Sequence, residues 1–143
     1  MGTAALVTRR MEERLESGPS RKVLLVDENA EDLHAYTEVL RRQGCDVRAC
    51  DSFHEGQGCL QAGSFDLVIV SQGSHAFEGR PVVEQAIETD REVPVVVVAT
   101  SVDIEAYLDA MQLGAKDYLE KPLSPRQLVE MVRKLPPPCA SAA

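Results

Sequence analysis

The stretch KVLLVDENAEDLHAYTEVLRRQG, residues 22–44, holds in order a strand, an acidic turn and a helix. The strand predicted at 22–27 is apolar almost throughout, which is typical of a parallel strand covered on both faces. The helix predicted at 31–42 follows directly after the turn. This order of strand, turn and helix is the unit from which the rest of the chain is built.

The chain contains five such units. Further strands are predicted at 46–50, 67–71, 95–99 and 117–119, and further helices at 54–61, 81–89, 104–113 and 125–134. Gly56 and Gly58 weaken the second helix, because glycine in a helix interior is unfavourable. Five βα repeats predict an α/β fold with three layers, in which helices cover both faces of a doubly wound, five-stranded parallel sheet.

Composition narrows the function. A chain of 143 residues with 44% hydrophobic residues suits one domain with one packed core. Fifteen basic and 23 acidic residues give a formal charge of −8, and without a basic cluster we expect no direct binding to nucleic acid. The longest apolar run, 95–99, is far shorter than the ~20 residues of a membrane span.

The cysteines indicate a reducing compartment. They form no C-x-x-C pair and the chain has no secretory start, so we expect reduced thiols in a soluble, cytoplasmic protein. The four are Cys45, Cys50, Cys59 and Cys139.

The two ends differ from the repeats in composition. In residues 1–20, Leu6, Val7, Met11 and Leu15 recur at helical spacing until Gly18-Pro19. This segment is either a frayed leader or a short helix that contacts a partner. Residues 135–143 are rich in proline and small side chains, and we expect a disordered tail. The folded domain is therefore predicted at 21–134.

Polar residues gather where the predicted strands end. The first strand ends in Asp27-Glu28, the third in Ser71, the fourth in Ala99-Thr100, and the fifth leads into Lys121-Pro122. Because ligands of such sheets bind at the carboxyl ends of the strands, this edge is the candidate site.

The acidic turn sets the chemistry of that edge. The adjacent carboxylates of this turn repel each other, and a hard cation or an ammonium group would neutralise that repulsion. Lys121 is the candidate for the ammonium group. The turn could also simply cap the helix that follows. The sequence DENAED has four carboxylates and no glycine, so it would repel a nucleotide phosphate, and a flavin or dinucleotide fold is disfavoured.

Four stretches carry a family resemblance: KVLLVDENAEDLHAYTEVLRRQG, FDLVIVSQG, VPVVVVATS and GAKDYLEKPLSPRQLVEMV. Over about 21–134 they resemble the receiver domain of bacterial response regulators. The last stretch is the most specific, since its residues follow the family's order and spacing; they are Gly114, Ala115, Asp117, Tyr118, Lys121, Pro122 and Leu123. The resemblance implies a flavodoxin-like (CheY-like) fold and a role in two-component, or phosphorelay, signalling.

The resemblance also implies residue roles. Asp27 and Glu28 match the acidic pair that holds Mg²⁺ in the family, and the backbone carbonyl of Gly73 would complete that metal site. Tyr118 matches the aromatic switch. Lys121 matches the phosphate-binding lysine, and Pro122 follows it through a bond that is commonly cis in the family.

Two positions depart from the family pattern. Ser71 stands where the phosphate-accepting aspartate belongs. Ala99 stands at the position of the phosphate-binding Thr or Ser, and Thr100, one step beyond, would face the pocket only if the strand end were bulged.

The serine weakens the case for phosphorylation. A serine hydroxyl is a poor nucleophile without a neighbouring base, whereas an aspartate is already ionised at neutral pH. Asp66 lies five strand residues away, roughly 16 Å at ~3.3 Å each, and is expected to be a strand-entry residue. A lone loop histidine, His75, is expected to be solvated.

The loss of one carboxylate also predicts weak Mg²⁺ binding. Lys121 is expected to turn to Asp27 or Glu28, in an exposed pair that contributes at most about 1 kcal/mol.

Three functional hypotheses follow. The first is an atypical receiver, or pseudo-receiver, which binds a histidine kinase or a downstream signalling protein through the 103–134 face, as a monomer or weak homodimer and without being an enzyme. This face would use Ile104, Tyr107, Leu108, Met111, Tyr118 and the segment 128–131. The second is a phosphorelay component that takes a phosphoryl group on Ser71 or another side chain. The third is a small enzyme that uses Asp27, Glu28 and Lys121. Both a stand-alone module and a piece of a longer kinase or regulator fit the sequence.

Overall fold

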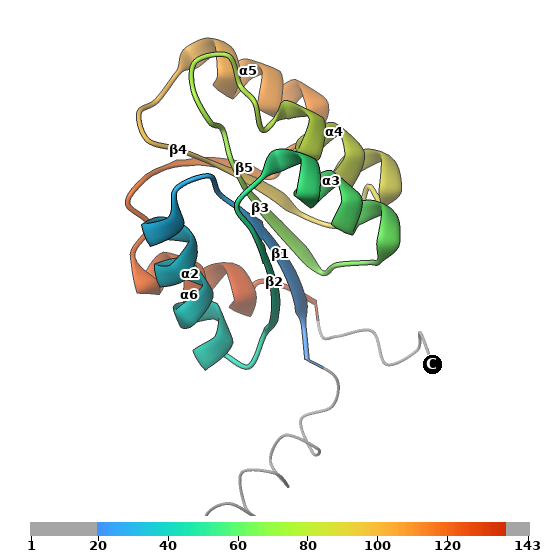
Figure 1. Ribbon diagram of the computed structural model, residues 1–143, viewed down its shortest axis with the longest axis vertical. Helices are drawn as coiled ribbons and strands as arrows, with labels where there is room; N and C mark the ends of the chain where they lie inside the picture. Colours follow the sequence, from blue (N-terminus) through green and yellow to red (C-terminus); the bar gives the residue numbers. More distant parts are fainter. Residues whose placement is uncertain (1–19, 137–143) are drawn as a thin grey trace, which may run out of the picture.

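A computed structural model describes residues 20–136 of the chain. Five parallel strands form one sheet in the order β2-β1-β3-β4-β5 (Figure 1). The strands are β1 (Lys22–Val26), β2 (Asp46–Cys50), β3 (Leu67–Ser71), β4 (Val95–Ala99) and β5 (Asp117–Glu120). The helices are α2 (Ala30–Arg42), α3 (Phe53–Ala62), α4 (Arg80–Thr89), α5 (Ile104–Leu113) and α6 (Pro125–Arg133). The predicted flavodoxin-like, three-layer α/β fold is therefore confirmed.

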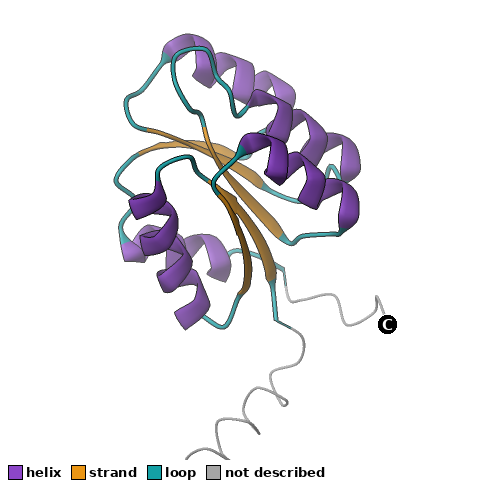
Figure 2. Cartoon of the chain, in the orientation of Figure 1, coloured by secondary structure: helices purple, strands orange, loops and turns teal. Residues whose placement is uncertain are grey.

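Helices cover both faces of the sheet (Figures 1 and 2). On one face, Leu24 and Val26 of β1 pack in a core with α3, α4 and α5. On the other, Val23 and Leu25 pack with α2 and α6. Successive side chains of a strand point to opposite faces, so a fully apolar strand serves both cores. This explains why VLLV shows no alternation of polar and apolar residues.

Local capping signals set the starts of the helices. The side chains of Asn29, Ser52, Asp103 and Ser124 accept hydrogen bonds from backbone N–H groups in the first turns of α2, α3, α5 and α6. These bonds satisfy donors that have no partner inside a helix. The observed bounds of every strand and helix agree with the predicted ones to within one residue at both ends.

Gly56 explains why α3 forms despite its glycines. A Cβ at this position would lie 2.7 Å from a methyl carbon of Val26. Only glycine lets α3 approach β1 so closely. The helix therefore gains burial against the sheet that offsets its low intrinsic propensity.

The end of the domain lies slightly beyond the expected boundary of 134. Leu135 is buried in the α2/α6 core, so the segment that was expected to be disordered from 135 begins with a core residue. The leader, predicted as either a frayed segment or a short helix, lies outside the described residues over 1–19, as does the tail from 137 onward. Within residues 20–136, no helix combines the length and apolar character needed to cross a bilayer.

Candidate functional site

Lys121 is the centre of a buried ionic cluster at the carboxyl edge of the sheet. Its Nζ donates to Asp27 Oδ1 at 3.0 Å and lies 2.8 Å from Asp27 Oδ2. It also donates to Asp32 Oδ2 at 3.0 Å. The side chains of Lys121 and Asp27 are only 7% and 3% exposed. Of the two expected partners, Asp27 and Glu28, Lys121 meets Asp27, but the expectation of an exposed pair was wrong, because both side chains are buried.

Burial and pairing oppose each other in this cluster. Burial lowers the pKa of Lys121, but its hydrogen bonds to Asp27 and Asp32 outweigh this and raise the pKa above its usual value. Burial raises the pKa of Asp27, while hydrogen bonds from Lys121 and from the Asn29 N–H lower it. The ammonium group is therefore held charged, and it supplies much of the stabilisation that the ionised Asp27 needs away from water.

Ser71 has a complete set of hydrogen bonds. Its Oγ donates to Glu28 Oε1 at 3.0 Å and accepts the N–H of Gly73 at 3.1 Å. The residue is 3% exposed. Glu28, the second acid of the pair, thus takes its hydrogen bond from a hydroxyl rather than from an ammonium group. The predicted gathering of one hydroxyl, two acids and one ammonium at this edge is confirmed.

The loop after Ser71 is shaped by two glycines. Gly73 has φ +85, in the left-handed region that favours glycine. A Cβ on Gly79 would lie 2.1 Å from the carbonyl oxygen of Ser71. The loop between β3 and α4 can therefore fold back over the end of β3 only with glycine at position 79.

Ala99 and Thr100 lie at the end of β4, where the resemblance would place a phosphate-binding hydroxyl. Ala99 is buried at the end of β4 and Thr100 is exposed beyond it. β4 ends without the bulge that Thr100 would need, and Ala99 pairs in register with Glu120. The Lys121–Pro122 peptide bond is cis, as the resemblance implied.

Tyr118 is held by a network that the sequence did not reveal. Its hydroxyl donates to Gln72 Oε1 and accepts the N–H of Asp103 at 3.1 Å. Gln72 is 3% exposed and also donates to the carbonyl of Ser74 at 3.1 Å. The network joins the β3–α4 loop to the start of α5 through the tyrosine of β5.

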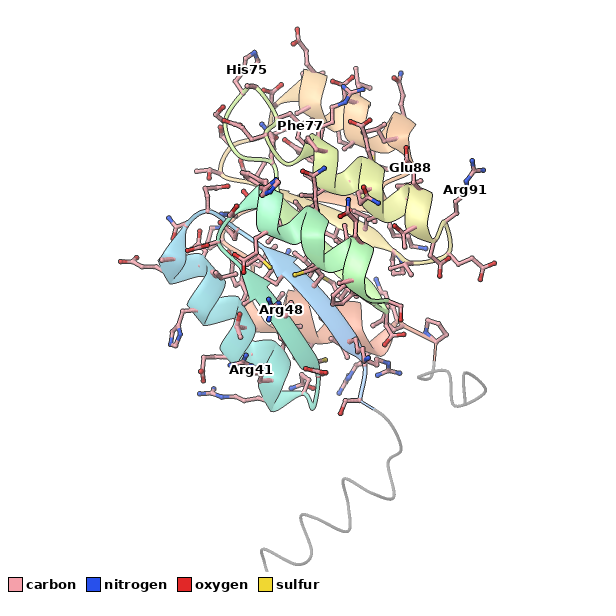
Figure 3. The ribbon with its side chains drawn as sticks, turned by 45° about the vertical axis from the view of Figure 1, so that its right-hand side comes forward. Arg41, Arg48, His75, Phe77, Glu88 and Arg91 are labelled. Carbon is pink, nitrogen blue, oxygen red and sulfur yellow. The ribbon has the colours of Figure 1, made fainter. Side chains whose placement is uncertain are left out.

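His75 adds a contact between the same two segments. Its ring contacts the carboxylate of Asp103, while its side chain is 79% exposed. It projects from the loop that leads to α4 (Figure 3). The expectation that His75 is solvated is confirmed, and its ring lies beside the cap of α5 rather than beside Ser71.

The acids at this edge already have partners. Asp27 accepts from Lys121 and from the N–H of Asn29, and Glu28 accepts from Ser71. In the part of the chain that the structure describes, no three His, Cys, Asp or Glu side chains are grouped as metal ligands. A cation at Asp27 would therefore share this carboxylate with the ammonium of Lys121.

The α5 face is the most apolar exposed surface in the described residues. Ile104 is 70%, Leu108 50%, Tyr107 41% and Met111 37% exposed, and Val102, before the helix, is 58% exposed. All four α5 side chains of the predicted contact face are thus free of the core. The predicted extension onto α6 was wrong at Leu128, which is 0% exposed and belongs to the α2/α6 core.

Three residues of the site escaped the sequence reasoning. Asp32 lies in the first turn of α2, where an acid also suits the helix dipole, so no local pattern linked it to Lys121. Gln72 and Asp103 resemble ordinary loop and capping residues. Only the packing of β5 against the loops after β3 and β4 brings them to Tyr118.

The chain belongs to the response regulator receiver domain family, whose family model matches residues 23–133. Receiver domains are signalling modules of two-component systems. The strand order and the acids, lysine and cis proline at one sheet edge agree with that class.

Individual relatives agree with the family. The chain is 30% identical over 123 residues to "Sensor protein GacS" of Pseudomonas syringae pv. syringae, covering 82% of this chain and 14% of the relative. It is 33% identical over 107 residues to "Alginate biosynthesis transcriptional regulatory protein AlgB" of Pseudomonas aeruginosa, covering 75% of this chain and 24% of the relative. The chain thus spans a quarter or less of the length of these two relatives.

A solved structure shows the same fold. The receiver domain protein (CheY-like) of Methanospirillum hungatei JF-1 matches with a TM-score of 0.76 at 22% identity, covering 81% of this chain and 93% of the other.

Proposed function

We propose that this chain is an atypical receiver that acts in two-component signalling by binding a protein partner, without phosphorylation of an aspartate. The observation that carries the proposal is Ser71, a buried residue at the end of β3 whose hydroxyl is bonded to Glu28 and to the N–H of Gly73. The resemblance assigns this position to the accepting aspartate. No carboxylate of β3 stands at this edge, because Asp66 lies at the opposite end and accepts the N–H of Lys22 at 2.7 Å.

A phosphorylated serine is the rival reading, and one contact favours it. Glu28 accepts a hydrogen bond from Ser71 and is positioned as a base. A carboxylate is a weak base toward the much less acidic hydroxyl of an alcohol. Burial also limits the approach of a phosphodonor to the hydroxyl. Binding without phosphoryl transfer is therefore the better account.

Binding would use the exposed α5 face, where Ile104, Tyr107, Leu108 and Met111 present apolar area to solvent. Contiguous apolar exposure of this kind marks interaction surfaces. The partner we propose is a histidine kinase or a downstream signalling protein, in the cytoplasm. Tyr118 packs edge-on against Tyr107 with ring centroids 5.5 Å apart, so the position of Tyr118 affects this face.

The hydrogen bonds of Tyr118 are the proposed reason why no phosphoryl group is needed. Gln72 and the N–H of Asp103 hold the hydroxyl in one place. We therefore expect Tyr118 to act as a fixed element of the α5 face rather than as a switch that responds to phosphate.

We also propose that Mg²⁺ binds weakly. Asp27, Glu28 and the carbonyl of Gly73 would be the protein ligands, and the metal would supply positive charge that neutralises an incoming phosphate. Competition from Lys121 for Asp27 makes this binding weak.

The test uses the full chain with Mg²⁺ and acetyl phosphate, followed by intact mass spectrometry. We expect no added phosphoryl group on the wild type. The variant Ser71→Asp restores a carboxylate in the same pocket and is expected to gain one phosphoryl group. The variant Ser74→Asp, in the exposed loop, is the matched control and is expected to remain unmodified. A phosphoryl group on wild-type Ser71 would overturn the proposal in favour of the rival reading.

A further inference from the structure

Two cysteine thiols that take no part in the ionic cluster face each other between the sheet and a helix. Cys50 ends β2 and Cys59 lies in α3, with their Sγ atoms 3.6 Å apart. We propose that this pair is a redox modification site, at which a hydroperoxide converts the two thiols into a reversible Cys50–Cys59 disulfide. This inference is independent of the proposed binding function.

The geometry needs little movement. A disulfide bond is about 2.05 Å long, so the sulfurs, now 3.6 Å apart, must approach by roughly 1.5 Å. The close approach of α3 to the sheet is set by Gly56, whose missing Cβ admits Val26. Cys59 lies three residues further on the same helix face, and it is thereby held against the end of β2.

The two sulfurs have different surroundings. Arg48 donates from Nε to Cys59 Sγ at 3.3 Å, and its side chain is 61% exposed, so reagents can reach this side of the pair. Figure 3 shows Arg48 on β2 with two sulfur atoms, in yellow, beside it beneath α3. The guanidinium group places a positive charge beside the Cys59 sulfur, on the exposed side of the pair. Cys50 is only 1% exposed, and its burial, followed by its hydrogen bond with Cys59, raises its pKa to about 12.

These differences assign the order of steps. The Cys59 thiolate attacks the terminal oxygen of the hydroperoxide, the O–O bond breaks, and the leaving alkoxide takes up a proton as an alcohol. Cys59 is now a sulfenic acid. The sulfur of Cys50 then attacks the sulfur of Cys59, the S–S bond forms, and the S–O bond breaks. The released hydroxide leaves as water with the proton of Cys50. Two thiols lose two electrons in total and the hydroperoxide gains them.

The disulfide would also reach the ionic cluster. The carbonyl oxygen of Cys50 accepts the backbone N–H of Asp27 at 3.0 Å. A covalent link from Cys50 to α3 therefore fixes the backbone next to the residue that holds Lys121. Oxidation and the state of the carboxyl edge are thus physically connected through one hydrogen bond.

The experiment oxidises the full chain with hydrogen peroxide and then blocks the remaining thiols with an alkylating reagent. Trypsin leaves both cysteines on one peptide, so cleavage with a glutamate-specific protease after Glu55 is needed to separate them. We expect fragments containing Cys50 and Cys59 that stay joined until a reducing agent is added, while Cys45 and Cys139 remain alkylated. Fragments that separate without reduction, or cysteines that pair at random, would overturn the proposal.

Two pairs of variants test the assigned roles. Cys50→Ala is expected to leave a sulfenic acid on Cys59 that dimedone traps, and Cys59→Ala is expected to give no trapped product. Arg48→Ala is expected to slow oxidation by roughly three- to tenfold through loss of the positively charged donor beside the Cys59 sulfur. Arg41→Ala, an exposed arginine on α2, is the matched control and should leave the rate unchanged. Equal rates in the two arginine variants would refute the role of Arg48.

Discussion

Replacing Lys121 with methionine removes the ammonium group that Asp27 and Asp32 share. At about 3 Å and an effective dielectric constant of ~20, one such contact corresponds to roughly 6 kcal/mol of attraction. The net loss is smaller, because removing the pair also removes the cost of burying the ammonium. Breaking a buried pair typically costs about 3–5 kcal/mol. Asp32 keeps water contact, since its side chain is 33% exposed, so we expect a loss of about 3 kcal/mol in the free energy of unfolding.

Urea denaturation followed by circular dichroism measures this loss. With a slope of ~1.5 kcal/mol per molar urea, 3 kcal/mol lowers the midpoint by about 2 M. Lys116→Met is the matched control, because this lysine is exposed and none of the salt bridges in the described residues includes it. We expect the control to change stability by no more than ~0.5 kcal/mol. Equal midpoints for the two variants would refute the description of Lys121 as the stabilising partner of a buried acid.

The pH dependence gives a second check of the same reasoning. The raised pKa of Lys121 means that the pair contributes fully below the unfolded value of 10.5 and is lost as pH rises through the higher folded value. The wild type should therefore lose more stability than Lys121→Met in that alkaline range. In the variant, Asp27 is buried without its cation and its folded pKa lies further above 3.8. The variant's deficit should therefore shrink as pH falls from 7 toward 5, because protonated Asp27 tolerates burial.

Three further predictions concern packing and are measured as urea unfolding free energies. Gly79→Ala places a Cβ 2.1 Å from the carbonyl oxygen of Ser71 and should destabilise the protein by about 2 kcal/mol or more. Gly58→Ala, in open space on α3, should instead stabilise it by ~0.5–1 kcal/mol. A change of the same sign in both variants would contradict the close approach of Gly79 to Ser71. Leu128→Ala should cost about 3 kcal/mol because the side chain is fully buried, and Leu108→Ala, 50% exposed on α5, should cost less than ~1 kcal/mol. Similar losses for the two variants would contradict the burial of Leu128 and the exposure of Leu108. Thr37→Val should be neutral or stabilising by up to about 1 kcal/mol, because the Thr37 hydroxyl is buried without a hydrogen-bond partner, and a clear loss would reveal a partner for it.

The order of elements followed from local patterns. Apolar strands such as VLLV, capping residues such as Asn29 and Ser124, and prolines at helix starts each act over a few residues, so they can be recognised without knowing the fold. Repetition of strand and helix then leaves a doubly wound sheet as the arrangement that buries both faces of each strand. The carboxyl edge, and with it Asp27, Glu28, Ser71 and Lys121, follows from that topology.

The hydrogen-bond and ion-pair partners within the site did not follow from the topology. Which carboxylate Lys121 meets depends on where the first turn of α2 lies relative to the end of β5, and this turn supplies Asp32 rather than Glu28. Ser71 and Glu28 are bonded because β1 and β3 are neighbours in the sheet, 43 residues apart in sequence. Distances of 3 Å between such distant residues are set by the packing of whole elements.

The sequence by itself determined the fold class, the edge at which polar residues gather and the absence of a carboxylate at the end of the third strand. Tertiary structure alone decided that Lys121 is buried between two acids, that Gln72 holds Tyr118 and that Cys50 faces Cys59. The physical reason is the range of the interactions. Periodicity and capping act within a few residues and are written in the local sequence, whereas ion pairs, close glycine contacts and thiol pairs form only where the packed helices and strands bring distant side chains together.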